Sequence, residues 1–191
     1  MDWREDIGAD ALEVKVAELL VATADESDAL IDGSVGEVLK LIRERMRMDV
    51  VFVSEFSEGR RVFQVVDQAP GGHAVAPGDS DPLEETWCQR IVDGRLPELV
   101  LDGPAAVADG RAPQTGTPVG TYVGAPIVLE GGEVYGTLCC FSYGKNPSVT
   151  QQDARTLRYT AQLTAQKIGN ARRRKAELEL VPIAENPFRK L

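Results

Sequence analysis

The spacing of hydrophobic residues predicts three amphipathic helices, two in the first quarter of the chain and one near its end. Apolar residues recur every three or four positions over residues 11–21, which places them on one face of a helix. The same spacing follows a Ser34–Glu37 capping box, and the helix that it predicts ends near Met48. The capping pair Thr150 and Asp153 predicts the start of a long last helix.

Two stretches of continuous or alternating apolar residues predict β-hairpins. The first hairpin joins residues 50–56 to residues 62–66 through the polar turn Ser57–Arg60. The second joins residues 122–129 to residues 133–142 through a turn with two adjacent glycines. In the second hairpin both alternating sets of side chains are largely apolar, so both faces of the sheet are expected to be covered.

Between the hairpins the sequence predicts a short helix and two loops. The helix begins with Asp81 as its N-cap, Glu84 completes a capping box, and Gly94 ends the helix. The segments 68–80 and 105–118 are rich in glycine and proline and are candidate lids over a cavity. The whole order predicts an α+β fold, in which helices pack on a central antiparallel sheet and long helices lie at both ends.

Charge and hydropathy narrow the possible partners. The 191 residues contain 21 Lys and Arg against 30 Asp and Glu, for a formal net charge of −9. Such a surface repels phosphate backbones and anionic lipid on average. The apolar runs are far shorter than the roughly 20 residues of a membrane-spanning helix, and no signal sequence opens the chain. We therefore expect a cytoplasmic protein that uses neither nucleic acid nor membrane as a partner.

The element order and several short strings resemble the GAF domain family. Gly120–Ile127 looks like the family's strand that ends in a small-Pro-aliphatic step, and Val134–Leu138 looks like its next strand. Residues 152–171, which end in Gly-Asn-Ala, resemble the closing helix of the family. Residues 85–94 are similar to a bacterial sensory subset, in which GAF domains are often fused to cyclic-di-GMP synthases or phosphodiesterases and act as their input.

The resemblance implies a three-part chain and a ligand cavity. Residues 1–33 would form an N-terminal helical extension, residues 34–171 the GAF domain, and residues 172–191 a C-terminal helix extension and tail. GAF domains bind cyclic nucleotides, bilins, haem or small metabolites between one sheet face and the covering helix and loops. A stand-alone regulatory domain that senses an unidentified small molecule is therefore the expected function.

Departures from the ligand-specific members of the family leave the cofactor unknown. Residues 103–120 contain neither the cysteine nor the histidine that bilin-binding members use. The sole histidine, His73, lies in a loop without metal-ligand spacing around it, so neither haem nor a metal site is expected. The Asn-Lys…Phe…Asp-Glu signature of cyclic-nucleotide members is not evident in the sequence either.

Candidate pocket residues follow from the predicted faces of the helix and strands. Trp87, Cys88 and Ile91 share one face of the helix that begins near Asp81, and this face is expected to look inward. An arginine on the same helix offers a planar fork of donors for a charged ligand group, or else pairs with glutamates on a solvated face. The candidates are Phe52, Glu84, Trp87, Cys88, Arg90, Tyr122, Thr137 and Cys139.

The three cysteines are expected to be reduced thiols. Cys139 and Cys140 are adjacent on a predicted strand, so they point to opposite faces of the sheet and cannot easily pair with each other. Cys88 lies on a capped helix whose dipole modestly favours a thiolate, which leaves two interpretations open. It is either a redox sensor or a small apolar wedge beside Trp87.

An enzyme of the same fold is the main alternative. Free methionine-(R)-sulfoxide reductases are GAF-fold enzymes that work by a cysteine thiolate and resolving cysteines. The chain has three cysteines, but they lie on a predicted helix and a predicted strand rather than on the loops that carry that family's cysteines. We therefore expect a non-enzymatic protein and keep the thiol enzyme as an alternative.

The terminal helices suggest an output route. Family members usually pair these helices into a dimer bundle, and a narrow apolar stripe here fits such a homodimer seam: Leu12, Val16, Leu19, Leu163, Ile168 and Leu178. The sequence contains no Gly-Gly-Asp-Glu-Phe or Glu-Ala-Leu signature, so output is expected through a signalling partner. In a further alternative, a ligand-free interaction module, aromatic side chains fill the cavity: Trp87, Tyr122, Tyr135 and Phe141.

Overall fold

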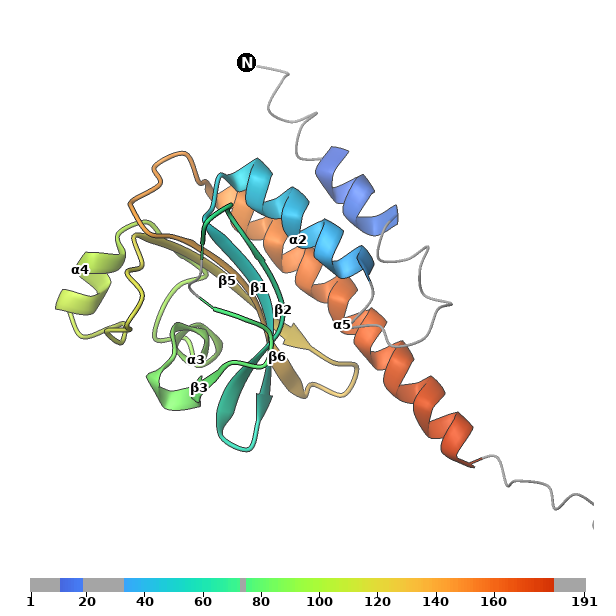
Figure 1. Cartoon of the computed structure of the whole chain (residues 1–191). Helices are drawn as coiled ribbons and strands as arrows, with labels where there is room; N and C mark the ends of the chain where they lie inside the picture. The colour runs from blue at the N-terminus through green and yellow to red at the C-terminus, as the bar shows by residue number, and fades with distance from the viewer. Residues whose placement is uncertain (1–10, 19–32, 73–74, 181–191) are drawn as a thin grey trace, which may run out of the picture.

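A computed structural model of the chain describes residues 11–18, 33–72 and 75–180. Its centre is a six-stranded sheet in the order β3-β2-β1-β6-β5-β4, and every neighbouring pair of strands is antiparallel (Figure 1). This confirms the predicted α+β class. The strands are β1 (Val50–Ser57), β2 (Arg60–Gln68), β3 (Ser80–Pro82), β4 (Leu99–Val100), β5 (Thr121–Val128) and β6 (Val134–Ser142).

The two faces of the sheet carry different layers. The long helices α2 (Gly33–Met46) and α5 (Gln151–Leu180) pack on one face, α2 against β1 and β2 and α5 against β5 and β6 (Figure 1). The other face carries the short helix α3 (Trp87–Val92), which packs on β5 and β6. The 3₁₀ turn η1 (Leu83–Glu85) precedes α3, and α4 (Gly103–Ala108) follows β4.

Each sheet face has its own hydrophobic cluster, as the two apolar faces of the second hairpin predict. Cys139 belongs to the cluster under α3, together with Phe52 and Tyr122. Cys140 belongs to the cluster under α2 and α5, and its Sγ lies 3.8 Å from Sδ of Met46. The predicted placement of the two cysteines on opposite faces is therefore confirmed, because successive side chains of a strand point in opposite directions.

Local sequence explains both hairpins. Between β1 and β2 the turn residues Glu58 and Gly59 have φ values of 51° and 73°. Two consecutive positive φ angles are the geometry of a type I′ turn, whose twist matches that of antiparallel strands. The turn between β5 and β6 contains Gly132 with φ 83°, which glycine adopts without strain.

The segment around Asp81 corrects the prediction of a single helix capped by this residue. Asp81 lies in β3, pairs with Arg61 across the ladder and forms an ion pair with its guanidinium. The carboxylate is therefore engaged by Arg61 and does not cap a helix, and Glu84 completes no capping box. The helix α3 begins six residues later, where Thr86 is the N-cap and its hydroxyl accepts a hydrogen bond from the Gln89 amide at 3.2 Å.

The candidate lid at residues 105–118 is partly helical rather than a loop throughout. It contains most of α4, whose N-cap Asp102 accepts a hydrogen bond from the Ala105 amide at 3.1 Å. A proline lies at the start of α4, where its missing N–H costs no hydrogen bond. The sequence did not predict this short helix, because a segment rich in Ala, Gly and Pro has no periodic pattern of apolar residues.

The terminal helices pack within the chain. The capping pair is confirmed, since Thr150 and Asp153 bond each other reciprocally at the start of α5. Val16, Leu163 and Ile168 of the predicted dimer seam are at most 9% exposed and belong to the core beneath α2 and α5, so they are not available to a second chain. Leu19 lies outside the described residues.

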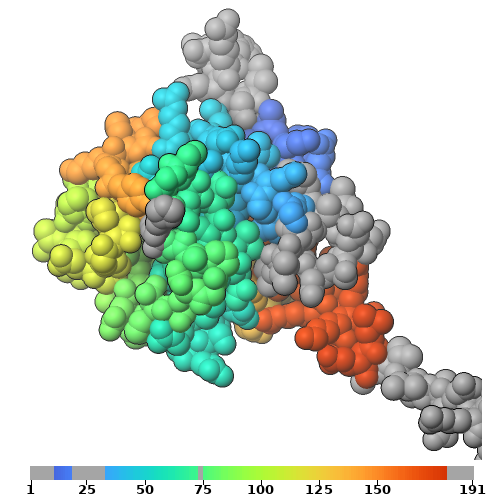
Figure 2. All heavy atoms as spheres, viewed as in Figure 1, coloured from blue at the N-terminus to red at the C-terminus, as the bar shows by residue number. Residues whose placement is uncertain are grey.

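The distal turns of α5 stand away from the body of the domain (Figure 2). Leu178 there is 76% exposed. None of the described helices is both long and apolar enough to cross a membrane, although α5 spans 30 residues.

Candidate functional site

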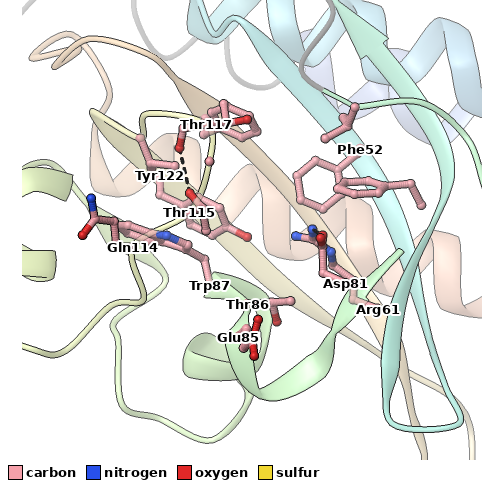
Figure 3. Close-up of a pocket in the computed structure, with 15 residues that line it drawn as sticks. Phe52, Arg61, Asp81, Glu85, Thr86, Trp87, Gln114, Thr115, Thr117 and Tyr122 are labelled. Atoms are coloured by element: carbon pink, nitrogen blue, oxygen red, sulfur yellow. Dashed lines mark hydrogen bonds and ion pairs between the residues drawn. The ribbon is translucent and has the colours of Figure 1, made fainter. Parts of the chain in front are cut away.

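A cavity of about 340 Å³ lies between the sheet and the segments that cover its α3 face (Figure 3). Its volume is within the range of sites for small ligands. Five aromatic side chains form most of its apolar wall: Phe52, Phe63, Trp87, Tyr122 and Phe141. Residues 114–117, from the second candidate lid, supply its polar rim, and Val75 from the first lid also lines it.

Arg61 is the one cation among the described residues that line the cavity, where Asp81 and Glu85 are also present. The Arg61 side chain is 12% exposed, and its guanidinium carbon lies 4.1 Å from the centre of the Phe63 ring. One end of the guanidinium pairs with Asp81, and Nη1 donates to Sγ of Cys88 at 3.6 Å. Among the described residues, none accepts a hydrogen bond from the buried Nε of Arg61. This Nε has almost no accessible surface, so a bound molecule reaches it only if the Arg61 side chain moves.

Strand geometry explains why Arg61 enters the cavity. Arg61 and Phe63 are two residues apart on β2, so their side chains lie on the same sheet face. Arg60 is exposed and bonds to Ser80 on the neighbouring strand. The alternation thus separates two adjacent arginines, one inside the cavity wall and one in solvent.

Two thiols lie directly behind the wall. Sγ of Cys88 is 3.3 Å from the Tyr122 hydroxyl and 3.9 Å from Sγ of Cys139. Burial by itself raises the pKa of Cys88, yet this pKa is lowered well below its usual value because Cys139, the Arg61 cation and hydroxyl groups stabilise the thiolate. Burial and then Cys88 raise the pKa of Cys139 well above its usual value. Cys139 therefore holds its proton more tightly than Cys88 does.

The structure brings most of the sequence-predicted pocket residues to one place. Phe52, Trp87 and Tyr122 line the cavity, and the Trp87 ring lies 5.2 Å from that of Tyr122. Trp87 also donates from Nε1 to the Pro113 carbonyl at 3.1 Å, which ties α3 to the polar rim. Cys88 and Cys139 are buried behind the wall, as is Thr137, whose hydroxyl lies 3.0 Å from that of Ser54.

Two predicted residues lie elsewhere. The Glu84 side chain is 78% exposed and forms an ion pair with Arg95 at 3.5 Å, because η1 turns it away from the sheet. Arg90 is half-buried on α3 and is not among the residues that line the cavity. Tyr135, predicted to fill a ligand-free cavity, belongs to the cluster on the opposite sheet face, where the Arg172 guanidinium lies over its ring.

Sequence reasoning did not single out most of the residues that give the cavity its polarity. They are Arg61, Asp81, Thr86 and, within the second candidate lid, residues 114–117. A signal for Arg61 was present, because it alternates with the buried Phe63 on a strand, and this pattern points both side chains inward. The composition of residues 105–118 predicted a lid that contains the rim residues, but an irregular segment between α4 and β5 offers no periodicity that would single them out.

The described part of the chain offers no cluster of metal ligands. Within residues 11–18, 33–72 and 75–180, no group of three His, Cys, Asp or Glu side chains could hold a metal ion. His73 lies outside the described residues.

Comparison with protein families identifies the architecture. A family model described as a GAF domain matches residues 29–168. A search of curated proteins gives no match to the chain.

Solved structures of GAF domains share the fold at low sequence identity. A sensor protein of the GAF type from Burkholderia vietnamiensis is 14% identical with a TM-score of 0.66, and the match covers 86% of this chain and 98% of that one. The phycoerythrobilin-bound GAF domain of a cyanobacterial phytochrome is 15% identical with a TM-score of 0.68, over 85% and 97% of the two chains.

An enzyme also shares the fold. The free methionine-R-sulfoxide reductase from Neisseria meningitidis, solved in complex with its substrate, is 15% identical with a TM-score of 0.65. The match covers 87% of this chain and 93% of the reductase. At these identities the likeness extends to the fold alone.

Proposed function

Because the chain belongs to the GAF domain family, we propose that it is a regulatory domain that binds a small molecule in the cavity under α3 and catalyses no reaction on it. The observation that carries this proposal is the cavity of about 340 Å³, whose aromatic wall includes the guanidinium of Arg61. Hydrogen bonds to charged groups contribute about 1.5–3 kcal/mol, so an acceptor on the ligand that pairs with this guanidinium would strengthen binding.

The lining defines the chemical class of the ligand. A hydrogen-bond acceptor is needed opposite Arg61, and a planar or apolar body fits between the rings of Phe63 and Trp87. Asp81 and Glu85 balance the charge of Arg61, so the ligand does not need a large negative charge. The volume of about 340 Å³ selects a compact molecule rather than a tetrapyrrole.

Output would pass through the sheet to α5. The helix packs on β5 and β6, the strands that carry Tyr122 and Cys139 on their cavity side. Ligand binding changes the position of α5 only if the two states of the helix differ in ligand affinity. We further propose that the protein acts in the cytoplasm as a homodimer through the distal turns of α5, where Leu178 is exposed, and signals to a partner protein.

Native mass spectrometry of the freshly purified protein tests ligand binding. We expect a species heavier than the denatured chain by the mass of one small molecule. Arg61→Gln should lose this species, whereas the matched variant Arg60→Gln should retain it, because Arg60 is exposed outside the cavity. A wild-type spectrum with the bare chain mass, together with an unchanged melting temperature across a metabolite panel, would favour the ligand-free interaction module instead.

The thiol enzyme is tested separately, because the close pair of Cys88 and Cys139 beside Arg61 is the kind of site that such an enzyme needs. The assay follows the consumption of free methionine-(R)-sulfoxide with a dithiol reductant. We expect no consumption of methionine sulfoxide above the rate measured without protein. Consumption by the wild type that Cys88→Ser abolishes would replace the non-enzymatic proposal.

A further inference from the structure

We propose that Cys88 and Cys139 are an oxidisable thiol pair, which a peroxide converts to a disulfide that joins α3 to β6. This proposal does not rest on ligand binding. The two sulfurs lie 3.9 Å apart although 51 positions separate the residues in the sequence. A disulfide needs sulfurs about 2.05 Å apart, so closure requires an approach of about 1.9 Å.

The third cysteine, Cys140, is not placed to form a disulfide with either member of the pair. Cys140 follows Cys139 directly, yet it lies on the opposite face of the sheet, beside Met46. The sheet backbone separates it from both other thiols. Burial raises the pKa of Cys140, and a neighbouring carboxylate raises it further, so Cys140 stays protonated at neutral pH.

The surroundings of the pair divide the two thiols into a nucleophile and a resolving group. Arg61 donates to Sγ of Cys88 and the Tyr122 hydroxyl lies within hydrogen-bond reach of it. Both contacts stabilise a thiolate on Cys88, which is the nucleophilic form of a cysteine. No cation among the described residues is a cause of the shift at Cys139, whose pKa is raised by burial and by the neighbouring Cys88. A buried cysteine that served only as an apolar wedge would not need a guanidinium against its sulfur.

The fold also leaves space beside the sulfur of Cys139. Gly124 on β5 lies opposite Cys139, and a Cβ at this position would be 3.1 Å from its Sγ. The missing side chain therefore makes room for the sulfur. Cys88 and Cys139 are fully buried. Both groups that contact Cys88, namely Arg61 and Tyr122, line the cavity, so peroxide reaches the thiolate only when one of these side chains moves.

The chemistry balances with peroxide as the oxidant. The Cys88 thiolate attacks one peroxide oxygen, the O–O bond breaks, and a sulfenic acid and hydroxide form. Cys139 then attacks the sulfenic sulfur: the S–S bond forms, the S–O bond breaks, and the Cys139 proton leaves with the oxygen as water. The two sulfurs lose two electrons, and the peroxide accepts them. The thiolate beside Arg61 disappears in the process.

Peroxide titration of the full-length protein, followed by intact mass and peptide mapping, tests the proposal. We expect the loss of two hydrogens and a linked pair of peptides containing Cys88 and Cys139. Cys140→Ser should leave the reaction unchanged, Cys88→Ser should abolish it, and Cys139→Ser should stop it at a sulfenic acid that dimedone traps. Far-UV circular dichroism of each variant checks that it is folded.

Rates provide a second measurement that does not depend on removing a thiol. Arg61→Gln removes the cation, and each unit by which the pKa of Cys88 rises above neutral pH reduces the thiolate fraction tenfold, so oxidation should slow by about tenfold. Arg60→Gln, which changes the neighbouring exposed arginine, should oxidise at the wild-type rate. The proposal is overturned if the folded wild type keeps three free thiols at peroxide concentrations that oxidise the urea-unfolded chain, or if mapping finds a different linkage.

Discussion

Gly136 on β6 leaves no room for a side chain, so its replacement by alanine measures how tightly β6 is packed against β1. A Cβ at this position would lie 1.9 Å from the Ser54 carbonyl oxygen and 2.9 Å from Cα of Glu55. Both atoms belong to the backbone of the paired strand, so no side-chain rotation relieves the contact. The two strands must separate locally, and their ladder hydrogen bonds must lengthen.

The cost follows from this geometry. Overpacking a rigid site costs about 1–3 kcal/mol, and breaking one buried backbone hydrogen bond adds about 1–3 kcal/mol, so we expect a loss of about 2–6 kcal/mol in the free energy of unfolding. For a chain of this length, 1 kcal/mol corresponds to roughly 2–4 °C in Tm, so Gly136→Ala should melt about 4–24 °C lower.

Urea unfolding followed by far-UV circular dichroism measures this loss, with Gly36→Ala as the matched control. Gly36 lies in α2, and a Cβ there would have no atom within 4 Å. Alanine is the better helix former, so the control should be stabilised by up to about 1 kcal/mol. A Gly136→Ala protein within about 0.5 kcal/mol of the wild type, the range of ordinary surface substitutions, would refute the close approach of the two strands.

Three further perturbations test other parts of the structure. Leu157→Ala should cost about 2–5 kcal/mol in urea unfolding because Leu157 is fully buried, whereas Tyr159→Ala, at a position 37% exposed, should cost far less. The hydrogen bond from Lys145 lowers the pKa of Asp102. The ionised carboxylate of Asp102 therefore adds to the free energy of unfolding at neutral pH, and this contribution is lost as pH falls through its folded-state pKa. Asp102→Asn should therefore lower the urea midpoint at neutral pH and not in strong acid. Leu178→Asp should shift sedimentation toward the monomer.

Each of these three predictions has a result that would contradict it. If Leu157→Ala and Tyr159→Ala lowered the free energy of unfolding equally, Leu157 would not lie on the core face of α5. A midpoint difference for Asp102→Asn that persists unchanged in strong acid would show that the charge of Asp102 is not its cause. An unaffected sedimentation coefficient for Leu178→Asp in a dimeric wild type would exclude the distal turns of α5 as the interface.

Local patterns in the sequence were sufficient for the two hairpins and the long helices α2 and α5. The β1–β2 hairpin forms because an apolar run, a polar turn with Gly59 and a second run follow one another within 20 residues, so pairing needs no distant information. The start of α5 also depends only on nearby residues, because the side chains of Thr150 and Asp153 each accept a hydrogen bond from the other's backbone amide. Such features depend on neighbours in the chain, which a sequence displays directly.

The polar part of the site depends on contacts between distant residues. Asp81 has the sequence surroundings of a helix cap, and only pairing of β3 with β2 gives its carboxylate to Arg61 instead. In the same way, nothing close to Cys88 in the sequence indicates that Cys139 lies beside it. Charge partners and thiol pairs of this kind are set by tertiary packing, which overrides local propensity.

The division of the interior by the sheet bears on how such a domain diversifies. Helices α2 and α5 enclose one apolar cluster, and the cavity lies within the other, with only the backbone layer between them. Substitutions at Phe63 or Thr117 alter what the cavity accepts without contacting the cluster that anchors the helices. New recognition properties can thus evolve, or be engineered, while the mechanical support for α5 stays intact.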